Sequence, residues 1–117
     1  MLRRVLARRP PGVAPTESWL ETRSVQVLRF GGIVELERQV EIRTPAGVRI
    51  GRVDFRFGRL IIEIDGKEWH PDFHADRRRW AELQSAGFLV LPATFRLVEF
   101  ETPQFIQLVR DLREQAH

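Results

Sequence analysis

The sequence predicts an α/β (α+β) domain in which a mixed central β-sheet is flanked by helices. Three observations support this prediction. Strand-like segments bounded by turn residues occupy 36–43, 48–57 and 59–65. Apolar residues recur at helical spacing near both ends of residues 16–117. A chain of 117 residues is also long enough for one hydrophobic core and too short for two.

The elements are expected in the order α-β-β-β-α-β-α. The first helix begins near Ser18, whose spacing to Glu21 fits a capping box, and ends at the pair Gly31 and Gly32. A hairpin follows, with the strands "LERQVEIR" and "VRIGRVDFRF" joined by a turn at "TPAG". The third strand, "RLIIEID", comes after a tight turn at Gly58.

The second half of the chain adds a helix, a strand and a helix. The segment that starts at Asp72, "DFHADRRRWAELQSAG", is a helix that ends at Gly87. "FLVLPATF" is the fourth strand, which should end early because Pro92 lacks a ladder donor. Thr102 and Pro103 begin the last helix. Its apolar stripe has the spacing i, i+3, i+4 and i+7 and comprises Phe105, Leu108, Val109 and Leu112.

Composition narrows the class of protein. Residues 1–15 combine basic residues with three prolines, so we expect a linker or the end of an upstream domain, followed by a single domain at 16–117. No apolar run approaches the roughly 18 residues that a membrane span needs, and no apolar signal-peptide core follows the basic start. The chain has no cysteine, which excludes disulfides and thiolate metal sites. We therefore expect a cytoplasmic protein that does not bind membranes.

The charge pattern favours a polyanionic partner. The net charge is +3, and all basic residues except Lys67 are arginines. If Glu21, Asp54, Glu63 and Asp65 gather in one pocket, the remaining surface is strongly basic. A basic surface around an acidic pocket suits a polyanion whose chemistry uses metal ions.

Side chains of the second and third strands should alternate between the two faces of the sheet. One face of the second strand would carry the apolar residues Val53, Phe55 and Phe57. The opposite face would carry Arg52, Asp54 and Arg56. In the third strand, Leu60, Ile62 and Ile64 oppose Ile61, Glu63 and Asp65.

Asp54, Glu63 and Asp65 gather on one sheet face if these two strands pair around Gly58. Three carboxylates so close would raise one another's pKa unless a cation lies among them. The alternative is the solvated face of an antiparallel hairpin. Against that alternative, the apolar Ile61 lies on the same face as Glu63 and Asp65.

Two helical acids also point toward the sheet. Glu21 falls within the apolar arc of the first helix, although it could instead be the N3 partner of a Ser18 cap. Asp76 lies on the apolar stripe of the second helix, where we expect a structural ion pair with Arg79, one turn later, and a catalytic role is the alternative.

Four arginines are candidates for binding a nucleic-acid backbone: Arg52, Arg56, Arg77 and Arg78. The alternative is that the helical arginines form a solvated face. Lys67 could stabilise a phosphate or orient a water, and a surface lysine in a turn is its alternative. His70, close to the acids, could act as general acid or base, or serve a structural role.

One pattern resembles the PD-(D/E)XK nuclease core: Asp54, an eight-residue gap, then Glu63-Ile64-Asp65 with Lys67 close by. More narrowly, "GRVDFRFGRLIIEIDGKEWH" and "DRRRWAELQSAGFLVL" look like the domain-of-unknown-function 559 family, which is related to the very-short-patch repair endonucleases. The similarity covers most of the chain, from about residue 18 to about residue 110.

The resemblance implies a restriction-endonuclease-like core with an acidic Mg²⁺ site on its central hairpin, where Mn²⁺ can substitute. Asp54 and Glu63 would be metal ligands with the Ile64 carbonyl as a third, and Glu21 would match the acid of the first helix. Asp65 takes the place of the signature lysine, as a third metal carboxylate or a catalytic group.

The sequence departs from the family pattern at three positions: Val53 stands for the signature proline, Lys67 lies two residues beyond the lysine's place, and Pro92 stands where relatives usually carry arginine. His70 stands at a position where the repair endonucleases also have histidine. The predicted catalytic set is therefore Glu21, Asp65, Lys67 and His70.

The function implied by the resemblance is a Mg²⁺-dependent DNA endonuclease that hydrolyses phosphodiester bonds in repair or defence. Cutting both strands would require a homodimer, and relatives occur behind an upstream DNA-binding segment. The alternative is a catalytically inactive nuclease-fold module that binds DNA or regulates a longer protein.

Overall fold

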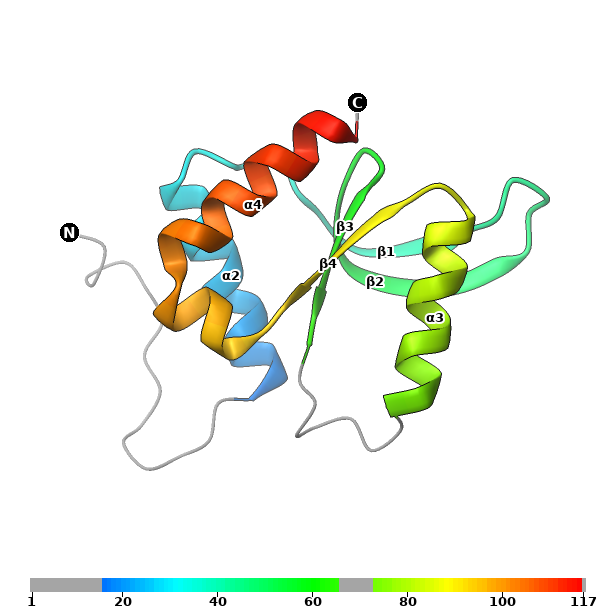
Figure 1. Cartoon of the computed structure of the whole chain (residues 1–117), viewed down its shortest axis with the longest axis horizontal. Coiled ribbons are helices and arrows are strands. Elements are labelled where there is room, and N and C mark those ends of the chain that lie inside the picture. The colour runs from blue at the N-terminus through cyan, green and yellow to red at the C-terminus, as the bar shows by residue number, and fades with distance from the viewer. Residues whose placement is uncertain (1–15, 66–72, 117) are drawn as a thin grey trace.

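The computed structural model describes the backbone of residues 16–65 and 73–116 and the side chains of 16–65 and 77–116 (Figure 1). The segment 1–15, predicted to be a linker, lies outside this part. The described elements are α2 (Glu17–Phe30), β1 (Glu37–Arg43), β2 (Arg49–Phe57), β3 (Leu60–Ile64), α3 (Phe73–Ser85), β4 (Leu89–Ala93), the short π-helix η1 (Arg96–Phe100) and α4 (Thr102–Gln115). The expected order is confirmed, with η1 as an addition.

The four strands form one mixed sheet in the order β1-β2-β3-β4. β1 pairs antiparallel with β2, and β2 antiparallel with β3 across the turn at Gly58. β4 then pairs parallel with β3, and this connection runs through α3, as a parallel pair requires. The predicted mixed sheet with flanking helices is therefore confirmed.

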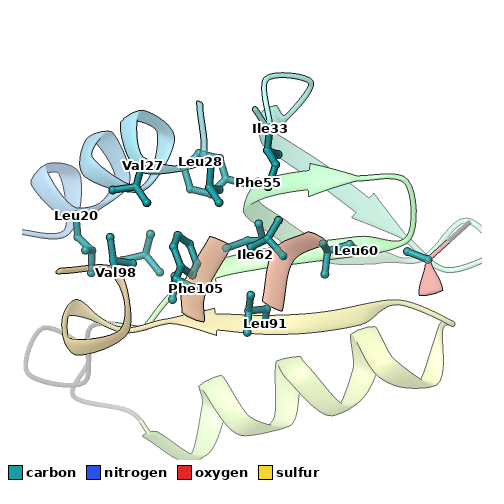
Figure 2. Packing of buried hydrophobic residues seen from close by; sticks show 14 residues of the cluster. Leu20, Val27, Leu28, Ile33, Phe55, Leu60, Ile62, Leu91, Val98 and Phe105 are labelled. Carbon is teal, nitrogen blue, oxygen red and sulfur yellow. The ribbon is translucent and has the colours of Figure 1, made fainter. Parts of the chain in front are cut away.

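Helices cover both faces of the sheet (Figure 1). On one face, α2 and α4 pack on a core that includes Leu20, Phe55, Ile62 and Phe105 (Figure 2). On the other face, α3 contributes Leu83 to a smaller cluster whose other fully buried members are Ile42, Val53 and Ile61. β3 lies between the two clusters, and all five of its residues are buried.

The first helix begins two residues earlier than its capping box predicts. Thr16, not Ser18, is the N-cap, because its Oγ1 accepts the Trp19 N–H at 3.0 Å. Both hydroxyl residues can cap a helix, and starting at Thr16 places Glu17 in the first turn, where its charge opposes the helix dipole favourably. The predicted end at Gly31 is confirmed, since Gly31 is the C-cap.

The predicted alternation along β2 is wrong at Val53. Phe55 belongs to the core under α2 and α4, whereas Val53 packs in the cluster under α3. The change of face coincides with the end of the β2–β3 ladder, which runs from the pair Phe57 and Leu60 to the pair Phe55 and Ile62 and stops before Asp54.

The fourth strand continues through Pro92 and ends at Ala93, two residues before the end of the expected segment. Because β4 is an edge strand, a residue without an N–H is tolerated there. In α4, Phe105 and Val109 are buried as predicted, but Leu108 is 40% exposed. Ile106 packs against the core instead, where it meets Gly31 at the end of α2.

No helix in the described part of the chain is both long and apolar enough to cross a bilayer.

Leu83→Ala should lower the free energy of unfolding by about 2–5 kcal/mol, because it empties a fully buried site between α3 and the sheet. Leu108→Ala removes the same atoms from an exposed position and should cost less than about 1 kcal/mol. Urea denaturation followed by circular dichroism measures both values. Similar losses in the two variants would contradict the described packing of α3 and α4.

Candidate active site

A cleft of about 320 Å³ opens beside the last residues of β3, between the sheet and α3. Its described lining combines acids with arginines: Glu17, Arg52, Asp54, Glu63, Ile64, Asp65, Arg79 and Trp80. The three strand carboxylates predicted to gather, Asp54, Glu63 and Asp65, therefore do line one cleft. They share it with two guanidinium groups, so the cleft is polar and carries both signs of charge.

Glu63 is the buried acid of the cleft, with only 5% of its surface exposed. Burial, and then a hydrogen bond with the Asp54 carboxyl, raise the pKa of its carboxyl to about 9 in spite of the nearby charge of Arg79, which lowers it. Glu63 therefore binds a proton at neutral pH in the absence of another cation. The nearby positive charge is therefore too small to keep both the Glu63 and the Asp54 carboxyl ionised.

Asp54 lies where the β2–β3 ladder stops. Its Oδ2 accepts the backbone N–H of Ile64 at 2.8 Å, in place of a backbone carbonyl of β2. Its Oδ1 lies 3.5 Å from the side-chain nitrogen of Gln39 on β1. The carboxyl is thus held from β3 and from β1, next to Glu63.

Arg79 of α3 crosses the cleft to the sheet. Its Nη2 pairs with the Glu63 carboxyl, and its Nη1 donates to the Arg52 carbonyl at 2.9 Å. Asp76, the predicted partner of Arg79, has a side chain outside the described residues. The sequence could not indicate the pair with Glu63, because these residues are joined only by the packing of α3 on the sheet.

Glu21 lies beside the cleft lining rather than in it, and it is tied to β1. Its Oε1 accepts from Gln39 at 2.9 Å and from Arg38 at 3.3 Å. Glu17, one turn earlier in α2, lines the cleft instead. Sequence reasoning missed both Gln39 and Glu17, although the helical spacing of Glu17 and Glu21 places them on one side of α2.

The residues fit a hard divalent cation in donor type but do not form a complete cage. Mg²⁺ prefers oxygen ligands, and Asp54 and Glu63 supply adjacent carboxyl oxygens in a largely buried position. Among residues with described side chains, no three Asp, Glu, His or Cys groups are arranged to hold a metal ion. Asp65 lines the cleft without completing such a group.

Arg52 and Arg56 occupy different settings. Arg52 is exposed and lines the cleft. Arg56 is half-buried at the far end of the hairpin, where its Nε donates to the Gly58 carbonyl at 2.8 Å and its guanidinium lies 5.2 Å from the centre of the Phe88 ring. Arg52 is therefore the better placed of the two to meet a ligand in the cleft.

Arg77 and Arg78 lie on α3. The Arg77 guanidinium stacks 5.3 Å from the centre of the Trp80 ring, and Trp80 itself lines the cleft. Arg78 pairs with Glu82 at 3.5 Å, and its side chain is 78% exposed. Such an exposed pair contributes little to stability, so Arg78 can exchange Glu82 for another anion at small cost.

Lys67 and His70, two members of the predicted catalytic set, lie outside the described residues.

A comparison with models of known protein families finds no match to this chain, and searches of curated proteins and of solved structures find none either. The resemblance to the domain-of-unknown-function 559 family therefore stays a prediction from its motifs.

The metal-free protein should lose stability as the pH rises from about 4.5 to about 9. Below this range Glu63 is protonated whether the chain is folded or not; within it, the folded protein keeps a proton that the unfolded chain releases. Above it, the carboxyl is ionised in both states and the effect levels off. Urea denaturation at a series of pH values, with a chelator present, measures this dependence.

Glu63→Gln is the test of the assignment, because a neutral amide of similar shape has no proton to lose. Its free energy of unfolding should vary less over this range than that of the wild-type protein. Glu114→Gln, an exposed change on α4, should keep the wild-type dependence. Parallel curves for the wild-type and Glu63→Gln proteins would show that Glu63 is not the group responsible.

Proposed function

We propose that this protein is a Mg²⁺-dependent DNA endonuclease with a restriction-endonuclease-like core. The observation that carries the proposal is the adjacent carboxyl pair of the buried Glu63 and the half-buried Asp54 in a cleft at the end of β3. Stability alone does not explain such a pair, since burying it costs free energy that an apolar pair would not. Binding a cation does explain it.

Asp54 and Glu63 would hold the metal, with Mn²⁺ as a substitute. When bound, such an ion neutralises phosphate charge and makes water a stronger nucleophile at neutral pH. The Glu63 carboxyl must give up the proton that it carries in the absence of a metal, so metal affinity should rise with pH. Asp65 and Glu17 line the same cleft.

The basic side chains fit a nucleic-acid backbone. Arg52 lines the cleft and would meet a phosphate chain that enters it, and Arg78 is exposed on α3, the helix beside the cleft. The net charge of +3 favours a polyanion, and affinity for DNA should fall steeply with salt. Cleavage of both strands would require two copies, and we place the activity in the cytoplasm.

A second candidate function is an inactive nuclease-fold module that binds DNA or regulates a longer protein. The pair between Arg79 and Glu63 favours this alternative, because a guanidinium already contacts the carboxyl that a metal would need. Asp65, in place of the signature lysine, favours it as well.

Supercoiled and mismatched plasmid DNA should be nicked by the wild-type protein with Mg²⁺ or Mn²⁺ and not with a chelator. Glu63→Ala and Asp54→Ala should reduce nicking by more than about 100-fold, the upper end of what loss of a supporting residue costs in a metal site. Glu114→Ala, on the exposed side of α4, is the matched control and should nick like the wild-type protein.

Metal-dependent DNA binding without nicking would favour the inactive module instead. Nicking that persists in Glu63→Ala would point to a contaminating nuclease or to another site, and either result would overturn the proposal.

A further inference from the structure

Gln39 has an unusual backbone conformation. Its φ of 53° is in the left-handed region, and it is the one non-glycine residue with positive φ in the described part of the chain. Glutamine is not favoured there, because its Cβ crowds the backbone. The residue lies in the middle of β1, where a regular strand conformation would otherwise be expected. Something outside the local backbone must therefore compensate.

The compensating contacts are made by the side-chain amide. Gln39 Nε2 lies 2.9 Å from Glu21 Oε1 and 3.5 Å from Asp54 Oδ1. Ionised carboxylates only accept hydrogen bonds, so the NH₂ end of the amide must face them both. One amide group thus links an acid of α2 to an acid of the cleft. Because Gln39 is exposed, apolar packing does not account for the conformation.

The position of Gln39 in the sheet explains why its side chain contacts Asp54. Its neighbours Arg38 and Val40 pair with Phe55 and Val53 of β2, so Gln39 faces Asp54 across the ladder. On the other side of Asp54, the Ile64 N–H binds Oδ2. The two oxygens of Asp54 are therefore held from opposite neighbouring strands, and Gln39 provides the hold from β1.

We propose that Gln39 is a positioning residue of the proposed metal site, acting through Asp54 and not on substrate itself. Its amide orients the Asp54 carboxyl toward Glu63 and fixes Glu21 of α2 at a set place beside them. This inference rests on the proposed function, because Asp54 must be a metal ligand for its orientation to matter. The left-handed backbone is retained because it aims the amide at both acids.

Gln39→Gly separates this role from a structural one. Glycine adopts a φ of 53° without strain, so the melting temperature should equal or exceed that of the wild-type protein. The amide is lost, so Mn²⁺ should bind about 10-fold to 100-fold more weakly in calorimetry, as expected for loss of a supporting residue. Nicking at subsaturating Mn²⁺ should fall in parallel and recover as Mn²⁺ is raised.

Glu41→Gly is the matched control, because it adds the same flexibility to β1 at an exposed position outside the described lining of the cleft. It should bind Mn²⁺ like the wild-type protein. Unchanged Mn²⁺ affinity in Gln39→Gly, or equal weakening in Glu41→Gly, would overturn the role of Gln39 while leaving the nuclease intact. A wild-type protein that neither binds Mn²⁺ nor nicks DNA would overturn the proposed function, and this inference with it.

Discussion

The burial of the Glu63 carboxyl is the constraint on which the arrangement of the cleft depends. Glu63 lies in β3, which pairs with β2 on one side and β4 on the other, and all five residues of β3 are buried. A buried carboxyl needs partners, and they come from different elements: Asp54 from β2 and Arg79 from α3. Any packing of α3 that moved Arg79 away would leave this carboxyl without its cation, so the docking of α3 and the geometry of the cleft are linked.

The irregular sheet and the cleft have a common origin at Asp54. Where the β2–β3 ladder stops, the Ile64 N–H would lack a partner, and the Asp54 side chain accepts it instead. Buried backbone N–H groups need a hydrogen-bond acceptor. Because the Asp54 side chain supplies one, β2 and β3 can stop pairing here without leaving a buried N–H unsatisfied. The Asp54 carboxyl therefore both accepts the N–H at the end of the ladder and lies next to Glu63.

Local sequence patterns predicted most of the fold. The features that they did not predict depend on contacts between residues distant in sequence. The order of elements, the turn at Gly58 and the gathering of strand acids follow from alternation and turn residues. Alternation failed at Val53 because a gap in pairing has no local signature. The left-handed Gln39 and the pair of Arg79 with Glu63 were also hidden, since both depend on residues distant in sequence. Thr16 and Ser18 both carry a hydroxyl that can cap a helix, and the helix begins after Thr16.

The balance of effects on Glu63 bears on which of the two functions the cleft favours. If Arg79 fully compensated the carboxyl, Glu63 would be an ionised member of a structural ion pair, as in an inactive module. Instead, desolvation and Asp54 outweigh the guanidinium, and the pKa rises to about 9. One positive charge is thus too little for the two carboxyls, and a proton supplies the difference. A divalent cation would supply it at neutral pH without protonation, which is why we favour a metal-dependent enzyme.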